Sequence, residues 1–153
     1  MMSLKYTLEF EETLPGFDVS GIPGEATPVF ILNESAMEGM PDRVIKNTQS
    51  WSVAFKWRIS GVTADVIGPG TWNIRAHLDR LSSGGGALMA GASSFAYKTA
   101  AGPDDYDQTI TIAAGSVPDG VYKLYVVVSL DTAATVPVTF FGEGPVMRFY
   151  TPT

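Results

Sequence analysis

The chain has 153 residues, of which 45% are apolar and 17% are charged; it has no cysteine, and its net charge is −6. This balance is typical of a globular domain and excludes a disordered chain. The missing cysteines exclude disulfides, thiol catalysis and thiolate metal sites, and the negative charge argues against a nucleic-acid partner.

The first third of the chain predicts two strands and a long connection. Residues 4–10 and 28–32 are strand candidates because they are rich in aromatic and aliphatic side chains. The Gly/Pro-rich stretch 14–28 is long enough to be an arm or a crossing loop instead of a simple hairpin, and residues 1–27 are a candidate N-terminal arm. Residues 35–38 have a capping-box pattern that predicts a single helical turn.

The middle of the chain predicts two amphipathic strands, WSVAFKWRIS at 51–60 and TWNIRAHLDRL at 71–81. In both, apolar and polar residues alternate, which is typical of a strand with one buried and one solvated face. The polar faces of these strands carry Lys56, Arg58, Arg75 and His77.

The last part of the chain predicts further short strands separated by Gly- and Pro-rich turns. The expected strands are 87–98, 109–113, 121–130, 136–141 and 145–150, with residues 100–108 as a loop before the second of them. About eight or nine strands with turns every 8–12 residues predict an all-β fold, a single antiparallel β-sandwich that spans residues 1–153.

The segment Asp119-Gly120-Val121-Tyr122 enters the most apolar of these strands. It resembles the tyrosine corner of immunoglobulin-like and fibronectin type III-like sandwiches, in which a tyrosine near the start of strand F bonds back to the preceding backbone. The resemblance covers about residues 45–150, with 109–113 in the place of strand E and 51–60 in that of B or C. It implies an architecture and names no function.

Outward-facing cations and an aromatic residue form the strongest candidate site. By alternation, Lys123 and Tyr125 point away from the core, as do the basic residues of the two tryptophan strands. If these strands are neighbours, they form one positive surface of the kind that proteins recognise. The predicted binding residues are Lys56, Arg58, Arg75, His77, Lys123 and Tyr125. We expect the acidic segment Glu9–Glu25 to lie across this surface, in its own chain or in a neighbour's.

The sequence contains only weak indications of a catalytic or metal site. His77 is the only histidine, and no nucleophile motif accompanies it and Asp79. The acidic run Asp104–Asp107 offers oxygen ligands for Ca²⁺ without EF-hand spacing. We therefore expect no enzyme, no cofactor and no metal.

The favoured function is a non-catalytic interaction or assembly module that binds a protein partner or itself. Two alternatives remain: a module for a small ligand or carbohydrate, and a hydrolase that uses carboxylates or His77.

The cellular setting is inferred from missing signals. The first residues, MMSLKYTLEFEE, lack the apolar core of a secretory signal. No run approaches the roughly 18 apolar residues of a membrane helix. We expect a cytoplasmic protein without a membrane partner; a form whose leader has been removed is the alternative.

Overall fold

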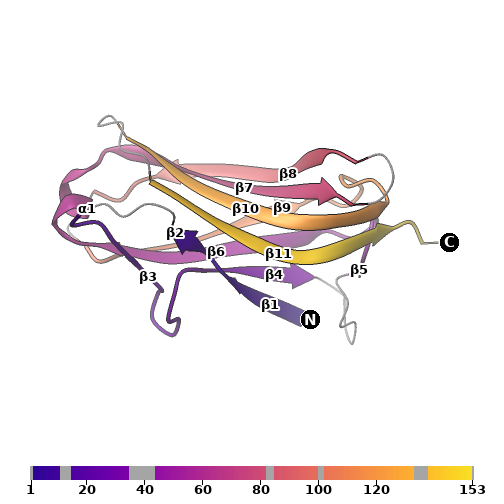
Figure 1. The fold of residues 1–153 in the computed structure, drawn as a ribbon, viewed down its shortest axis with the longest axis horizontal. Coiled ribbons are helices and arrows are strands. Elements are labelled where there is room, and N and C mark those ends of the chain that lie inside the picture. The colour runs from indigo at the N-terminus through magenta and orange to yellow at the C-terminus, as the bar shows by residue number, and fades with distance from the viewer. Residues whose placement is uncertain are drawn as a thin grey trace.

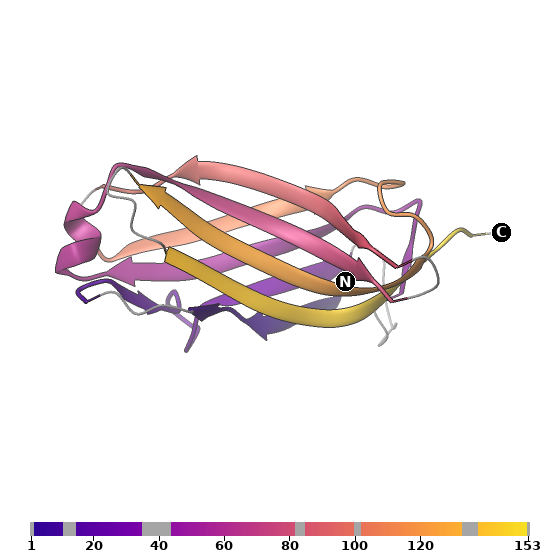
Figure 2. The same ribbon diagram turned by 45° about the horizontal axis from the view of Figure 1, so that its top comes forward.

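Alternating apolar and polar residues organise the chain into strands that pack as two sheets. The computed structural model describes residues 2–10, 15–34, 44–81, 85–99, 102–132 and 138–152. These residues form eleven strands and one short helix, with the strands running along the long axis of the molecule (Figures 1 and 2). The predicted helical turn at 35–38 lies outside the described residues.

The two sheets, named sheet A and sheet B, pack face to face. Sheet A consists of β1 (Met2–Thr7), β3 (Asp18–Ser20), β4 (Val29–Glu34), β6 (Trp51–Ser60) and β9 (Asp104–Ile112). Sheet B consists of β2 (Glu9–Phe10), β5 (Val44–Lys46), β7 (Gly70–Arg80), β8 (Ala87–Ala96), β10 (Gly120–Thr132) and β11 (Val138–Tyr150). All pairs are antiparallel except the short parallel pair of β5 and β11. The predicted all-β sandwich is confirmed.

The sheets are held together by a core rich in aromatic side chains. Trp57 of β6 and Trp72 of β7 are fully buried, and their rings meet edge to face with centroids 5.0 Å apart. Tyr106 of β9 and Phe140 of β11 pack against both. Each large ring buries about 150–250 Å² of mostly apolar surface, so this cluster is an important contact between the sheets.

The N-terminal segment crosses between the sheets. β1 pairs with β4 in sheet A, whereas β2 pairs with β11 in sheet B. Leu8 lies at the crossing with 2% of its surface exposed, and its N–H donates a hydrogen bond to the carbonyl of Pro28. Among the described residues of the acidic segment, Glu25 forms an ion pair with Lys5 of β1 at 2.7 Å. Its partner is therefore not one of the predicted binding residues. Residues 11–14 lie outside the described residues.

Two sequence-based boundaries are wrong. The predicted loop 100–108 is strand from Asp104 onward, because its polar residues pair across the sheet with β6. The two strands predicted at 136–141 and 145–150 are one strand, β11, with a bulge opposite Leu124 of β10. Gly144 permits that bulge, since a Cβ there would lie 2.9 Å from the Leu124 side chain.

A short helix, α1 (Val62–Val66), closes one end of the sandwich (Figure 1). The Thr63 hydroxyl donates to the Pro15 carbonyl at 2.5 Å, and the Tyr97 hydroxyl donates to the Ala64 carbonyl at 2.5 Å. Burial raises the pKa of the Tyr97 hydroxyl, with Tyr106 and two aspartates adding to the effect, so this group remains a proton donor. These contacts are long-range, which explains why the sequence pattern does not indicate the helix.

Candidate functional site

The six predicted binding residues lie on two different sheets. Lys56 and Arg58 belong to β6 of sheet A, while Arg75 and His77 lie on β7 of sheet B. Lys123 and Tyr125 lie on β10, which pairs with β7. Since β6 pairs with β3, β4 and β9 but with no described strand of sheet B, the expected single positive surface does not form.

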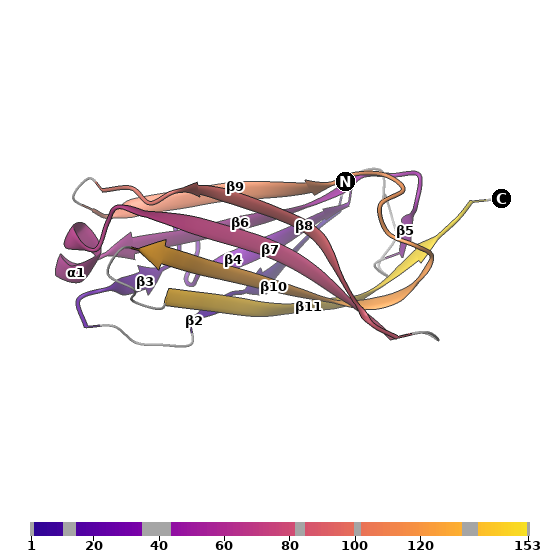
Figure 3. The same cartoon turned by 90° about the horizontal axis from the view of Figure 1, so that it is seen from above.

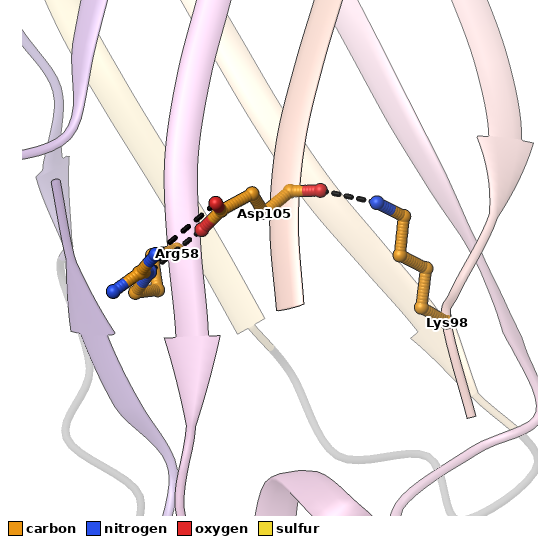
Figure 4. A network of polar contacts seen from close by, with 3 residues as sticks. All are labelled: Arg58, Lys98 and Asp105. Carbon is orange, nitrogen blue, oxygen red and sulfur yellow. Dashed lines mark hydrogen bonds and ion pairs between the residues drawn. The ribbon is translucent and has the colours of Figure 1, made fainter. Parts of the chain in front are cut away.

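The two predicted cations of sheet A are held by carboxylates of the neighbouring strand. The Arg58 guanidinium binds Asp105 through two hydrogen bonds of 2.6 and 3.1 Å (Figure 4). Lys56 lies 3.7 Å from Asp107. The Lys98 ammonium donates to the backbone carbonyl of Asp105. The hydrogen bond from Arg58 lowers the pKa of the Asp105 carboxyl, and the same contact raises the pKa of Arg58. A bidentate pair of this kind joins β6 to β9.

These pairs also change the interpretation of the acidic run Asp104–Asp107. The run is not a flexible loop, because it forms the first half of β9. Two of its carboxylates face Arg58 and Lys56, so their oxygens are already bound to cations. Within the described residues, no group of three or more His, Cys, Asp or Glu side chains is placed to hold a metal ion. The geometry therefore does not favour calcium at this position.

The other four predicted residues come together on the outer face of sheet B. His77 lies directly opposite Tyr125, while Arg75 and Lys123 occupy the adjoining rows of the same face. In the described part of the chain, the side chains of these four residues make no hydrogen bond or ion pair. They are therefore available to a partner, in contrast to Lys56 and Arg58.

Apolar side chains complete this surface, which we name the sheet B face. The pairing register places Met89 beside His77, Val127 beside Arg75, and Val146 beside Lys123. Met89 and Val146 are 56% and 50% exposed. The same register places the carboxylates of Asp79 and Glu143 on this face, opposite Lys123 and Tyr125. The sheet B face is thus defined by Arg75, His77, Asp79, Met89, Lys123, Tyr125, Val127, Phe141, Glu143 and Val146.

The sequence pattern indicates only part of the sheet B face. The adjacent pair Phe140 and Phe141 indicates that one ring must leave the core, and Phe141 is that ring. The apolar run of β10 conceals Val127, whose outward position follows from alternation with the buried Val126 and Val128. Met89 carried no such signal, because a bulge at Ala90 shifts the alternation within β8.

Two cavities lie on the N-terminal side of the sandwich. One of about 540 Å³ is lined largely by apolar residues and backbone of the segments 7–10 and 15–19, and Asp18 is the charged residue in its lining. The second, of about 390 Å³, is more polar, and its lining consists of Tyr6, Thr7, Glu9, Phe141, Gly142 and Glu143. The buried hydroxyl of Tyr6 has no hydrogen-bond partner among the described residues.

The sequence matches no known family model, and no curated protein matches it either. None of the described helices has the length and apolar character required to cross a membrane.

Proposed function

We propose that this protein is a non-catalytic interaction or assembly module and that its recognition surface is the sheet B face. The observation that carries the proposal is the gathering of Arg75, His77, Lys123 and Tyr125 on one face, with no partner for any of these side chains in the described residues. Buried or paired cations stabilise a fold, whereas unpaired outward cations beside aromatic groups are typical of binding surfaces.

The composition of the sheet B face indicates the chemistry of the partner. Its centre is amphipathic, because Tyr125 lies between Lys123 and the row that Val127 shares with Arg75. Tyrosine, arginine and methionine are favoured where proteins meet, and lysine and arginine at the rim attract acidic partners. Asp79 and Glu143 of the same face would pair with cations. We infer a protein partner that presents an apolar anchor surrounded by charged groups of both signs.

The proposal is tested by placing a photoreactive phenylalanine at Tyr125 in living cells and identifying the cross-linked protein. The cross-link is expected to weaken when Arg75 is changed to alanine. The matched control is Lys56→Ala, a cation of sheet A that faces Asp107, and it should leave the cross-link intact. The proposal would be refuted if Arg75→Ala and Lys56→Ala reduced the cross-link equally. It would also be refuted if the probe at Tyr125 cross-linked no more than the same probe at Thr111 of sheet A.

We further propose that the sandwich is of the immunoglobulin type. Its support is the strand order: β4, β6 and β9 match strands A, B and E, while β11, β10, β7 and β8 match G, F, C and C′. The Tyr122 hydroxyl donates to the Pro118 carbonyl at 2.8 Å, as a tyrosine corner requires. Trp72 lies on the strand in the place of C and is fully buried, as the tryptophan of antibody domains is. The strands β1, β2, β3 and β5 have no counterpart in this assignment, and the missing cysteine pair is a further departure from the pattern.

Binding of a small polar ligand such as a carbohydrate is the second candidate function. It is favoured by the 390 Å³ cavity, whose lining includes the carboxylates of Glu9 and Glu143 and the aromatic residues Tyr6 and Phe141. Carboxylates that accept hydrogen bonds, together with an aromatic ring, suit a polyhydroxylated ligand. Titration calorimetry against a glycan panel should then detect binding that Glu9→Gln weakens and Tyr125→Phe does not. Binding that is indifferent to Glu9→Gln would exclude this cavity. The hydrolase hypothesis remains a prediction with no support from the described geometry.

A further inference from the structure

β8 is an open edge of sheet B. It pairs with β7 and with no other described strand, so one side of its backbone presents unpaired N–H and C=O groups. An edge of this kind is a template for another strand unless the protein protects it. The ten residues of β8, ALMAGASSFA, include no charged residue and no proline.

The other edges of the sandwich carry protection. β9, at the neighbouring edge of sheet A, has three aspartates, and β1 at the opposite edge has Lys5. The outer side of β11 is paired by β2 and β5, and Pro145 interrupts the stretch between them. Charges, proline and bulges are the usual means of blocking edge pairing. Among the described strands, β8 is the long edge with neither a charge nor a proline, and its single bulge lies at Ala90.

The second half of β8 pairs with β7 in a regular register. The bulge at Ala90 divides the strand and leaves Gly91–Ala96 as an uninterrupted run. The side chains that this run turns outward are small and exposed, namely Ala92, Ser94 and Ala96. Figure 3 shows this half of β8 passing close to β9, and Phe95 on its inner side meets Tyr106 at 6.0 Å. The run is therefore anchored from the inside and open at its edge.

We propose that β8 pairs antiparallel with β8 of a second copy of this chain, about a two-fold axis perpendicular to the sheet. An antiparallel pair of identical strands is self-complementary, which is the usual form of a symmetric dimer. The net charge of −6 makes two copies repel, and the uncharged β8 is where an approach meets the least repulsion. At the adjacent β9 edge, Asp105 and Asp107 are offset by Arg58 and Lys56.

This pairing would join the two recognition surfaces. An axis perpendicular to the sheet keeps the outer faces of both copies on the same side, so the two sheet B faces become one continuous surface. A partner with repeated binding elements would then bind with higher avidity than one face allows. This consequence rests on the proposed function, whereas the dimer itself does not.

Sedimentation velocity over a concentration series tests the dimer directly. The full chain should sediment as a species of about twice 16.3 kDa, and Ala92→Lys or Ala96→Lys should weaken the dimer by about tenfold or more. Thr111→Lys, which places the same charge on β9, is the control and should leave the dimer intact. A monomeric wild type, or equal weakening by Thr111→Lys, would overturn the proposal. Near-UV circular dichroism verifies that each variant is folded.

Single cysteines give an independent measurement, because the chain has none of its own. Under mild oxidation, at least one of Ala92→Cys, Ser94→Cys and Ala96→Cys should form a covalent dimer, since residues near the two-fold axis approach their own copies. Thr111→Cys should not, and a failure of all three β8 positions would contradict the pairing. An intact β8 dimer without a cross-link at Tyr125 would refute the proposed function alone. A cross-link at Tyr125 in a monomer would refute the β8 proposal alone.

Discussion

Replacing Tyr122 by phenylalanine tests whether one hydroxyl holds the corner where β10 begins. Tyr122 is 2% exposed, and its hydroxyl donates to the Pro118 carbonyl at 2.8 Å. The ring meets Phe149 edge to face at 5.6 Å. Phenylalanine keeps this ring packing and leaves no cavity, so the substitution removes the hydrogen bond and little else.

The expected cost follows from that hydrogen bond. A neutral intramolecular hydrogen bond contributes about 1 kcal/mol to the free energy of unfolding, and more when a buried partner is left unsatisfied. Pro118 is exposed, so its carbonyl can bind water in the variant. We therefore expect a loss of about 1 kcal/mol, which lowers the melting temperature by roughly 2–4 °C in a chain of this length.

Urea unfolding followed by tryptophan fluorescence measures this loss as a lower midpoint with an unchanged slope. The matched control is Tyr125→Phe on the same strand, where the hydroxyl has no hydrogen-bond partner among the described residues and its removal should leave the midpoint unchanged. An unchanged midpoint for Tyr122→Phe, or an equal loss for Tyr125→Phe, would refute the assignment of the two faces of β10.

Three further predictions concern the stability of the fold and rest on contacts of Asp105, Asp107 and Gly91. The Arg58 hydrogen bond lowers the pKa of the Asp105 carboxyl below its usual 3.8. The pair therefore stabilises the fold above pH 3.8, and this contribution is lost as the pH falls through the lowered pKa. The melting temperature should consequently fall less steeply with acidification in Asp105→Asn than in the wild type. Gly91→Ala should lower the free energy of unfolding by about 1–3 kcal/mol, because the new Cβ would lie 2.5 Å from a methyl carbon of Ile110. In urea unfolding, the double variant with Ile110→Ala should then lose less than the sum of the two single losses, and strict additivity would contradict the contact. Calcium or a chelator should leave the melting temperature unchanged, since the carboxylates of Asp105 and Asp107 face cations; a rise of several degrees with calcium would show that the ion displaces them.

Alternation along each strand determined which side chains face the core. The predicted strand 51–60 coincides with β6, and Trp51, Val53, Phe55, Trp57 and Ile59 are all buried. The same rule placed Lys123 and Tyr125 outward from β10. It succeeds because successive side chains of a strand point to opposite faces, which is a local property of the backbone. The hydrogen bond of Tyr122 to Pro118 was also predictable, since the two residues are four positions apart.

Only the tertiary structure decided which sheet each strand joins. Alternation is the same for β6 and β7, yet Lys56 and Arg58 lie on sheet A, while Arg75 and His77 lie on sheet B. Sheet membership depends on pairing between strands that are distant in sequence, and no local pattern encodes it. That pairing brings Asp105 to Arg58 and leaves Arg75 and Lys123 without partners in the described residues. It therefore separates the cations that stabilise the fold from those that are free to bind.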